Sequence, residues 1–207
     1  MAMKTLRFLL LFFILLAAPA TALAAKDEPP DVLAKRTTEE VLTIIRQDSE
    51  IKHNRKKLFA LIDAKVLPHF DFTHMTRLAV GRHWSGATPQ QQQDLVREFR
   101  TLLVRTYSTA LTNYKNQKVV FKPLHMQPGE TDVTIKTESI QSGEKPIPID
   151  YMMEKSPAGW KVYDIAVDNV SLITNYRSSF SSEINKNGVE GLIKVLKNKN
   201  QTSEAEK

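Results

Sequence analysis

Three aspartates near the end of the predicted sheet come closest to a catalytic set. Asp150, Asp164 and Asp168 could act as a general acid and base, since adjacent carboxylates can have separated pKa values. Tyr163 is the one further acid–base candidate beside them. The alternative is structural: Asp164 and Asp168 would bond backbone groups, or an arginine such as Arg177, where a strand gives way to a helix. We favour this alternative, because structural carboxylates outnumber catalytic ones.

Histidine, cysteine and glycine supply no familiar reactive motif. The chain has no cysteine, which excludes thiol catalysis and thiolate metal sites. No two histidines are three or four residues apart, the spacing that places two imidazoles on one helical face. Seven glycines and no nucleophile-elbow, zincin, P-loop or dinucleotide signature leave no phosphate-cradling loop. We therefore expect no metal, no cofactor and no enzyme activity. The five histidines are His53, His69, His74, His83 and His125.

Residues 1–24 have the three parts of a secretory signal peptide. Lys4 and Arg7 supply a positive start, Phe8 to Ala18 is an unbroken apolar run, and Ala22-Leu23-Ala24 is a small-x-small cleavage site. A membrane anchor is the alternative, but a spanning helix needs about 20 apolar residues. We expect cleavage near Ala24 and export. An exported chain without cysteine depends on packing alone, which is typical of a bacterial periplasmic protein.

The net charge is positive and allows two interpretations. Removal of Lys4 and Arg7 with the signal lowers the formal charge from +6 to +4. Export makes nucleic acid an unexpected partner, so the anionic candidates are lipid headgroups and acidic protein surfaces. A charge of this size is equally compatible with a role in solubility alone.

The apolar spacing changes twice along the chain. It is helical from Asp31 to Tyr114, mostly alternating from Lys118 to Val167, and helical again afterwards. This order predicts one α+β domain over 25–197, followed by a polar, frayed tail over 198–207. The strongest helix begins at Thr88, which is followed by Pro89 and by Gln91 in a capping-box pattern. We expect this helix to be the centre of the core.

Four antiparallel strands are predicted between the helical regions, joined by short turns. The strands contain Val119 and Phe121, then Val133 and Ile135, then Ile147 to Met153, and a last one from Trp160. Apolar faces of this kind usually close on one another as a solid core, because periodicity reports a buried face and never a cavity. From the residues alone we therefore expect a packed core.

Several stretches, in order along nearly the whole chain after residue 24, resemble the MlaC family, the toluene-tolerance auxiliary proteins of an ABC transport system. A local departure is Asp168-Asn169, where relatives often have Glu-Gly. The matching stretches are Phe70-Asp71-Phe72, Met75 to Gly81, Trp84, Ala87 to Gln91, Glu98-Phe99, Leu102 to Tyr107, Leu111 to Tyr114, Ile147 to Tyr151, Gly159 to Asp164, Val170 to Arg177 and Gly188 to Leu192.

The resemblance implies a periplasmic phospholipid carrier. Its fold would be α+β, with N- and C-terminal helices on a four-stranded antiparallel curled sheet of the nuclear-transport-factor-2 type that encloses an apolar pocket. It would shuttle phospholipid between an outer-membrane lipoprotein complex and an inner-membrane ABC transporter with its substrate-binding partner, and so maintain outer-membrane lipid asymmetry. The phospholipid would be cargo rather than cofactor.

The same resemblance implies which residues contact the acyl chains. We assign tail contacts to eight positions and a supporting wall to three more. The tail contacts are Tyr107, Leu111, Ile147, Ile149, Tyr151, Val170, Leu172 and Ile173, and the wall residues are Leu78, Leu103 and Val162.

Two other functions would need a different interior. A periplasmic enzyme would need a polar acid–base set inside the pocket, for which Asp150, Asp164 and Tyr163 are the candidates. A binding protein for small polar solutes, or a docking module without ligand, would have a polar or solid core. The lining of the interior therefore distinguishes these hypotheses from a lipid carrier.

Overall fold

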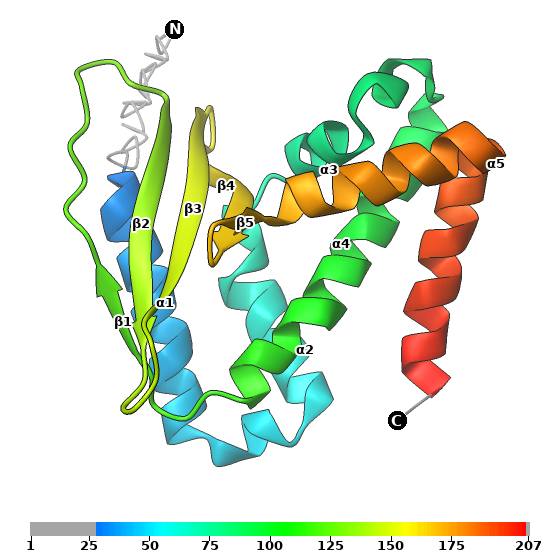
Figure 1. Cartoon of the computed structure of the whole chain (residues 1–207). Helices are drawn as coiled ribbons and strands as arrows, with labels where there is room; N and C mark the ends of the chain where they lie inside the picture. The colour runs from blue at the N-terminus through cyan, green and yellow to red at the C-terminus, as the bar shows by residue number, and fades with distance from the viewer. Residues whose placement is uncertain (1–27, 206–207) are drawn as a thin grey trace, which may run out of the picture.

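The helices of this chain precede and follow a single sheet, which confirms the predicted α+β class (Figure 1). The structure is a computed structural model that describes residues 28–205, so the expected signal peptide lies outside the described residues. The helices are α1 (Pro30–Gln47), α2 (Arg55–Lys65), α3 (Phe72–Val80), α4 (Pro89–Thr112) and α5 (Leu172–Ala205), with short 3-10 turns at Ser49–Lys52, Leu67–His69 and Gly81–Gly86. The strands are β1 (Lys118–Phe121), β2 (Asp132–Ile140), β3 (Ile147–Ser156), β4 (Gly159–Val167) and β5 (Val170–Ser171).

The sheet is an antiparallel meander in the order β1-β2-β3-β4-β5. Ile135 of β2 pairs with Tyr151 of β3, which pairs in turn with Ile165 of β4. The β3–β4 register shifts once, between Met152 and Met153. Because β-strand side chains alternate between faces, this shift changes which β4 residues share a face with Tyr151.

The predictions of four strands and of a curled sheet were wrong. A fifth strand, β5, pairs Val170 with Val167 across the two-residue turn Asp168-Asn169. Both turn residues have positive φ, 51° and 64°, a conformation that Asp and Asn tolerate and that matches the twist of a tight hairpin. The sheet is uncurled, and Figure 1 shows β2 and β3 as long strands side by side. A single register shift leaves the strand ladders otherwise regular.

The long helix α4 begins and packs as predicted. Thr88 accepts a hydrogen bond from the backbone N–H of Gln91, and the Gln91 side chain accepts one from the backbone N–H of Thr88. This capping box satisfies two N–H groups that have no partner within the helix. Leu95, Phe99 and Leu103 are buried against α3 and α5, so α4 is the centre of the helical core.

The C-terminal helix bends at Gly188 and continues beyond residue 197. Gly188 has φ 72°, and the chain turns there into a second helical segment (Figure 1). Residues 198–205, for which we predicted a polar, frayed tail, continue this helix. Asn200 is 6% exposed, and its side chain donates to the backbone carbonyl and the carboxylate of Glu98, each at 3.0 Å.

The first half of helix α1 packs on the sheet, whereas Val41 and Ile45 in its second half pack against α2 and the end of α4. Leu33 is buried with Val133, Met153, Trp160 and Val162 of β2, β3 and β4. In residues 28–205 no helix combines the length and the apolar content that a membrane crossing needs. Besides this α1–α2 cluster, the described chain has two packed regions, a helical core around α4 and a sheet covered by the first half of α1.

Candidate functional site

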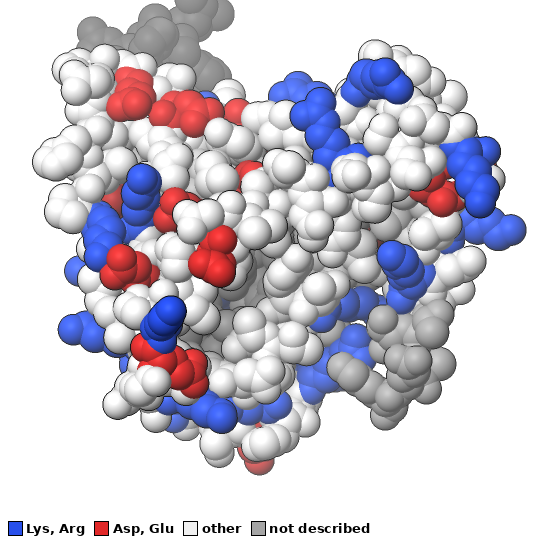
Figure 2. All heavy atoms as spheres, in the orientation of Figure 1, with Lys and Arg blue, Asp and Glu red and all other residues white. Residues whose placement is uncertain are grey.

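An apolar cavity lies where these two regions meet. Its volume is about 370 Å³, and its wall comes from α1, α2, the segment 66–75, α4, β3, β4 and the start of α5. Figure 2 shows a hollow on this face of the molecule, between the sheet and the helices. Ligand pockets usually measure about 300–1,000 Å³, so the cavity is of a size that binds ligands. The expectation of a solid core was therefore wrong at this boundary.

Seven of the residues predicted to form the site line this cavity. They come from four elements: the second half of α4, the central parts of β3 and β4, and the first residue of α5. The structure thus brings them together around one space. They are Leu103, Tyr107, Leu111, Ile149, Tyr151, Val162 and Leu172.

The other four predicted residues lie outside the cavity wall. Leu78 and Ile173 pack in the helical core. Ile147 is 43% exposed at the start of β3, and Val170 is 58% exposed in β5. Ile147 and Ile149 share a face of the strand, but the cavity extends only as far as Ile149. Contact of these four residues with a lipid stays a prediction.

Sequence reasoning missed the contribution of α1 and of the segment after α2. Leu33, Thr37 and Val41, four residues apart, place one face of α1 along the cavity. The available signal was two threonines, Thr37 and Thr38, within an otherwise apolar stripe. The remaining unpredicted wall residues are Ala34, Leu42, Ile62, Val66, Leu67, His69, Phe70, Phe72, Met75, Val104, Ser108, Ala110, Met153, Ile165 and Val167.

The few polar groups of the wall favour their neutral forms. Partial burial raises the pKa of Tyr107 to about 12, with the neighbouring Tyr176 adding to the shift. Burial also raises the pKa of Tyr151, against the effect of a hydrogen bond with Thr38. Burial lowers the pKa of His69, and the positive charges of Arg36 and Lys161 act in the same direction. No Asp, Glu, Lys or Arg is among the wall residues, so the interior suits an uncharged apolar ligand.

One wall hydroxyl has no partner within the described chain. Thr37 Oγ1 is buried, and no protein atom of residues 28–205 makes a hydrogen bond with it. An unmade hydrogen bond at a buried hydroxyl costs about 1–3 kcal/mol. The Thr37 hydroxyl therefore lowers the stability of the folded protein, because no hydrogen bond compensates for its burial.

The proposed acid–base residues do not face the cavity. Asp150, Asp164 and Tyr163 are absent from its wall. The Tyr163 hydroxyl donates to the carboxylate of Asp132 at 3.0 Å, and the pKa of Tyr163 is raised to about 12, first by burial and then by this carboxylate. The enzyme hypothesis placed these groups inside the pocket, and the geometry does not support it. The apolar wall likewise does not suit a small polar solute.

Asp164 has the structural role that we favoured. Its carboxylate accepts hydrogen bonds from the backbone N–H groups of Ile165 and Ile173 and from the hydroxyl of Ser171. Asp168 instead lies exposed in the β4–β5 turn.

His74 pairs with Glu154, with 2.5 Å between Nδ1 and Oε1. Among residues 28–205 no group of three or more acidic or histidine side chains is arranged to hold a metal ion.

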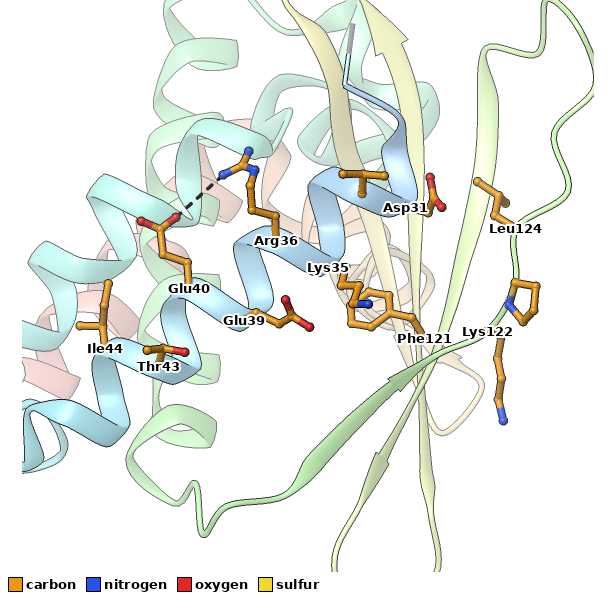
Figure 3. Close-up of a pocket in the computed structure, with 12 residues that line it drawn as sticks. Asp31, Lys35, Arg36, Glu39, Glu40, Thr43, Ile44, Phe121, Lys122 and Leu124 are labelled. Carbon is orange, nitrogen blue, oxygen red and sulfur yellow. Dashed lines mark ion pairs between the residues drawn. The ribbon is translucent and has the colours of Figure 1, made fainter.

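A second depression is a surface groove beside α1. It measures about 960 Å³ and lies between α1 and the segment 121–124 of β1 and the following loop. Figure 3 shows charged side chains of α1 along one side and Phe121, Lys122 and Leu124 on the other. Arg36 and Glu40 pair across one helical turn at 3.8 Å. The groove is lined by charges of both signs and by none of the predicted site residues, so the cavity is the better candidate.

Comparison with known proteins decides the family. The profile of the MlaC protein family matches residues 35–198, which is most of the chain. The chain belongs to the MlaC family. The resemblance inferred from the sequence motifs is thereby confirmed.

Relatives of this MlaC-family chain include curated proteins and a solved structure. It is 26% identical to the intermembrane phospholipid transport system binding protein MlaC of Haemophilus influenzae, over 84% of this chain and 83% of that protein. It is 24% identical to the toluene tolerance protein ttg2D of Pseudomonas putida, over 82% and 79%. The phospholipid-binding protein of Ralstonia solanacearum, solved in complex with a phospholipid, is 39% identical, with a TM-score of 0.80 over 86% of this chain and 99% of that one.

Proposed function

We propose that this MlaC-family protein is a phospholipid carrier whose cavity holds acyl chains. The observation that carries the proposal is a cavity wall without charged side chains, located between α1, α4 and the sheet. The Ralstonia relative, which shares this fold at 39% identity, was solved with a phospholipid. Both observations support a ligand that is mostly hydrocarbon.

The energetics of phospholipids explain why a carrier would need such a cavity. A two-chain phospholipid has about 30 methylenes, and exposing them to water costs about 0.8 kcal/mol each, or roughly 24 kcal/mol. Diffusion of a free monomer between membranes is therefore negligible. A protein that buries the chains removes this cost, and it needs only loose contacts to the headgroup.

The wider transport role is part of the same proposal. The carrier would be exported after cleavage near Ala24 and act in the periplasm as one domain over 25–197. It would shuttle phospholipid between an outer-membrane lipoprotein complex and an inner-membrane ABC transporter with its substrate-binding subunit, which would maintain outer-membrane lipid asymmetry. We also propose that the fold is related to the nuclear-transport-factor-2 type. The names of the Haemophilus and Pseudomonas relatives, with their reference to transport and toluene tolerance, support this role.

Extraction of the purified protein tests the proposal directly. Residues 25–207 would be expressed with an export signal, purified without detergent, extracted with organic solvent and analysed by mass spectrometry. We expect co-purified phospholipid near one molecule per chain. Repeated preparations without phospholipid would contradict the carrier function.

A pair of matched substitutions localises the binding. Ile149→Asp places a charge in the cavity wall and should abolish co-purification of phospholipid, because an unpaired buried charge is strongly unfavourable. As the control, Val32→Asp places a charge on α1 at an exposed position outside the cavity wall and should leave loading near that of the wild type. Thermal unfolding of both variants shows whether each is folded. If the two variants carry equal amounts of phospholipid, the cavity is not where the phospholipid binds.

A further inference from the structure

Arg77 and Arg82 flank the end of α3 at Gly81, and the side chain of Arg177 from α5 reaches the same place. A Cβ atom built on Gly81 would lie 3.2 Å from Nε of Arg177, so the guanidinium of Arg177 rests directly over this glycine. Arg77 precedes Gly81 by four residues, and helical neighbours at that spacing are about 5–6 Å apart. Arg82 follows Gly81 in the chain, and all three arginines are exposed. The glycine thus leaves room for the Arg177 guanidinium, within one helical turn of the backbone positions of Arg77 and Arg82.

No acidic side chain of residues 28–201 forms an ion pair with these arginines. None of the three arginines takes part in an ion pair within the described chain, whereas Arg97 pairs with Asp94 and Arg100 pairs with Asp63. Like charges held together without a counter-charge are a cost to the folded state. Such an arrangement binds anions, and the planar guanidinium suits phosphate and carboxylate in particular.

The cluster is the centre of a larger charge asymmetry. Residues 72–86 carry two arginines and no acid, and residues 172–201 carry five Lys and Arg against two Glu. The strand region 118–171 instead carries six Lys against eight Asp and Glu. Figure 2 shows Lys and Arg predominating over the side formed by α3 and α5, and acids mixed with them over the sheet. A field of this kind orients the whole molecule toward a negatively charged surface.

Exposed apolar side chains adjoin the cavity next to this basic region. Val170, Val167 and Tyr107 are 58%, 36% and 37% exposed, and Val167 and Tyr107 also line the cavity. Leu172, a wall residue, precedes Arg177 by five residues, which is about 7.5 Å along α5. Basic side chains beside an apolar rim are the combination that binds at a lipid–water interface.

From these observations we propose that the arginine cluster of Arg77, Arg82 and Arg177 docks the protein on the surface of a bilayer rich in anionic phospholipid, with the apolar rim of the cavity beside the headgroups. The inference rests on the proposed carrier function, because a phospholipid carrier must approach lipid surfaces. The apolar rim favours a bilayer over an acidic protein segment, which would need only the cations.

Vesicle flotation tests the docking surface. The full chain from residue 25 would be mixed with vesicles of phosphatidylglycerol and phosphatidylcholine in equal parts, or of phosphatidylcholine alone. We expect binding to the anionic vesicles alone, and loss of this binding as ionic strength rises to about 0.5 M, where screening is strong. The double variant Arg77→Ala, Arg177→Ala should lower the partition coefficient by about fivefold for each arginine removed.

A matched control separates the cluster from net charge. Lys118→Ala with Lys136→Ala removes the same charge from exposed positions in the strand region and should change the partition coefficient by less than about twofold. Arg177→Lys keeps the charge over Gly81 and should retain most of the binding. Thermal unfolding identifies any variant that fails to fold, and Arg82→Ala provides a further test away from the α3–α5 contact.

Several results would overturn the proposal. These are equal losses in the arginine and lysine double variants, no vesicle binding at low salt, or binding to polyglutamate without binding to vesicles, which would indicate an acidic protein partner. Mass spectrometry of the co-purified lipid is a separate readout. If the cargo is retained while vesicle binding fails, only the docking inference fails; if no cargo is found, the carrier function itself fails.

Discussion

The carboxylate of Asp164 and the hydroxyl of Ser171 are 2.5 Å apart, and this contact joins β4 to the start of α5. The same carboxylate accepts the backbone N–H of Ile173 at 3.2 Å, one of the helix N–H groups that lack a partner within the helix. Because Leu172 lies between Ser171 and Ile173 and lines the cavity, Asp164 fixes one edge of the site without touching its interior.

Asp164→Ala should lower the free energy of unfolding by about 3 kcal/mol. The substitution leaves buried donors of Ser171 and Ile173 without an acceptor, and each such loss costs about 1–3 kcal/mol. Asp150→Ala, which removes a carboxylate from the neighbouring strand, should cost less than about 0.5 kcal/mol. Urea unfolding of both variants makes the comparison. Similar losses at the two positions would show that Asp164 has no special anchoring role.

Thr37→Val and Thr38→Val should have opposite effects on stability. The Thr37 hydroxyl is buried without a partner, so its replacement by a methyl group should raise the free energy of unfolding by about 1 kcal/mol. The Thr38 hydroxyl bonds Tyr151, so the same change there should lower it by about 1 kcal/mol. Differential scanning calorimetry measures both. A stabilised Thr38→Val variant would contradict this account of the two wall hydroxyls.

His69 should make the protein less stable in acid. Burial lowers the pKa of the folded-state imidazole, so the unfolded chain, with an ordinary histidine pKa of about 6.5, binds the proton first. Stability therefore falls as the pH drops below about 6.5 toward the folded-state pKa. His69→Gln should show a smaller fall between pH 7 and pH 5 in urea unfolding than the wild type, and an equal fall in the two proteins would contradict this role of His69.

Ending the chain after Lys197 should destabilise the protein. Such a chain loses the two hydrogen bonds from Asn200 to Glu98 and the backbone carbonyl that accepts from Arg105. We expect a loss of about 2 kcal/mol, since hydrogen bonds to charged groups contribute about 1.5–3 kcal/mol each. A chain ended after Gln201 keeps these contacts and should unfold at the temperature of the full chain. Coincident melting curves would restore the interpretation of residues 198–201 as a tail.

Local sequence signals were sufficient for most of the secondary structure. The capping box at Thr88 and Gln91 fixes the start of α4 through contacts within one turn, so the residues alone predict it. Gly81 and Gly188 likewise mark conformations with positive φ that glycine tolerates. The β5 strand was missed because its turn contains Asp168-Asn169 rather than a glycine, although both residue types tolerate this geometry.

The candidate site was less predictable because a cavity depends on what covers each face. Ile147 and Ile149 have the same periodicity and the same chemistry, yet only Ile149 lies in the cavity wall. Hydrophobic spacing placed α1 correctly as a helix but could not indicate that Leu33 and Thr37 border an open space. The family resemblance supplied seven wall residues that periodicity alone would have assigned to a solid core.

The position of helix α1 also determines when the cavity can form during folding. This helix is synthesised first, but Leu33 packs with Val133 and Trp160, which follow about 100 residues later. Contacts at that separation form slowly, since the intervening chain must lose its freedom before they contribute. The cavity therefore stays incomplete until β4 and Leu172 of α5 have been synthesised. Lipid uptake can begin only when both ends of the domain are available to enclose the lipid.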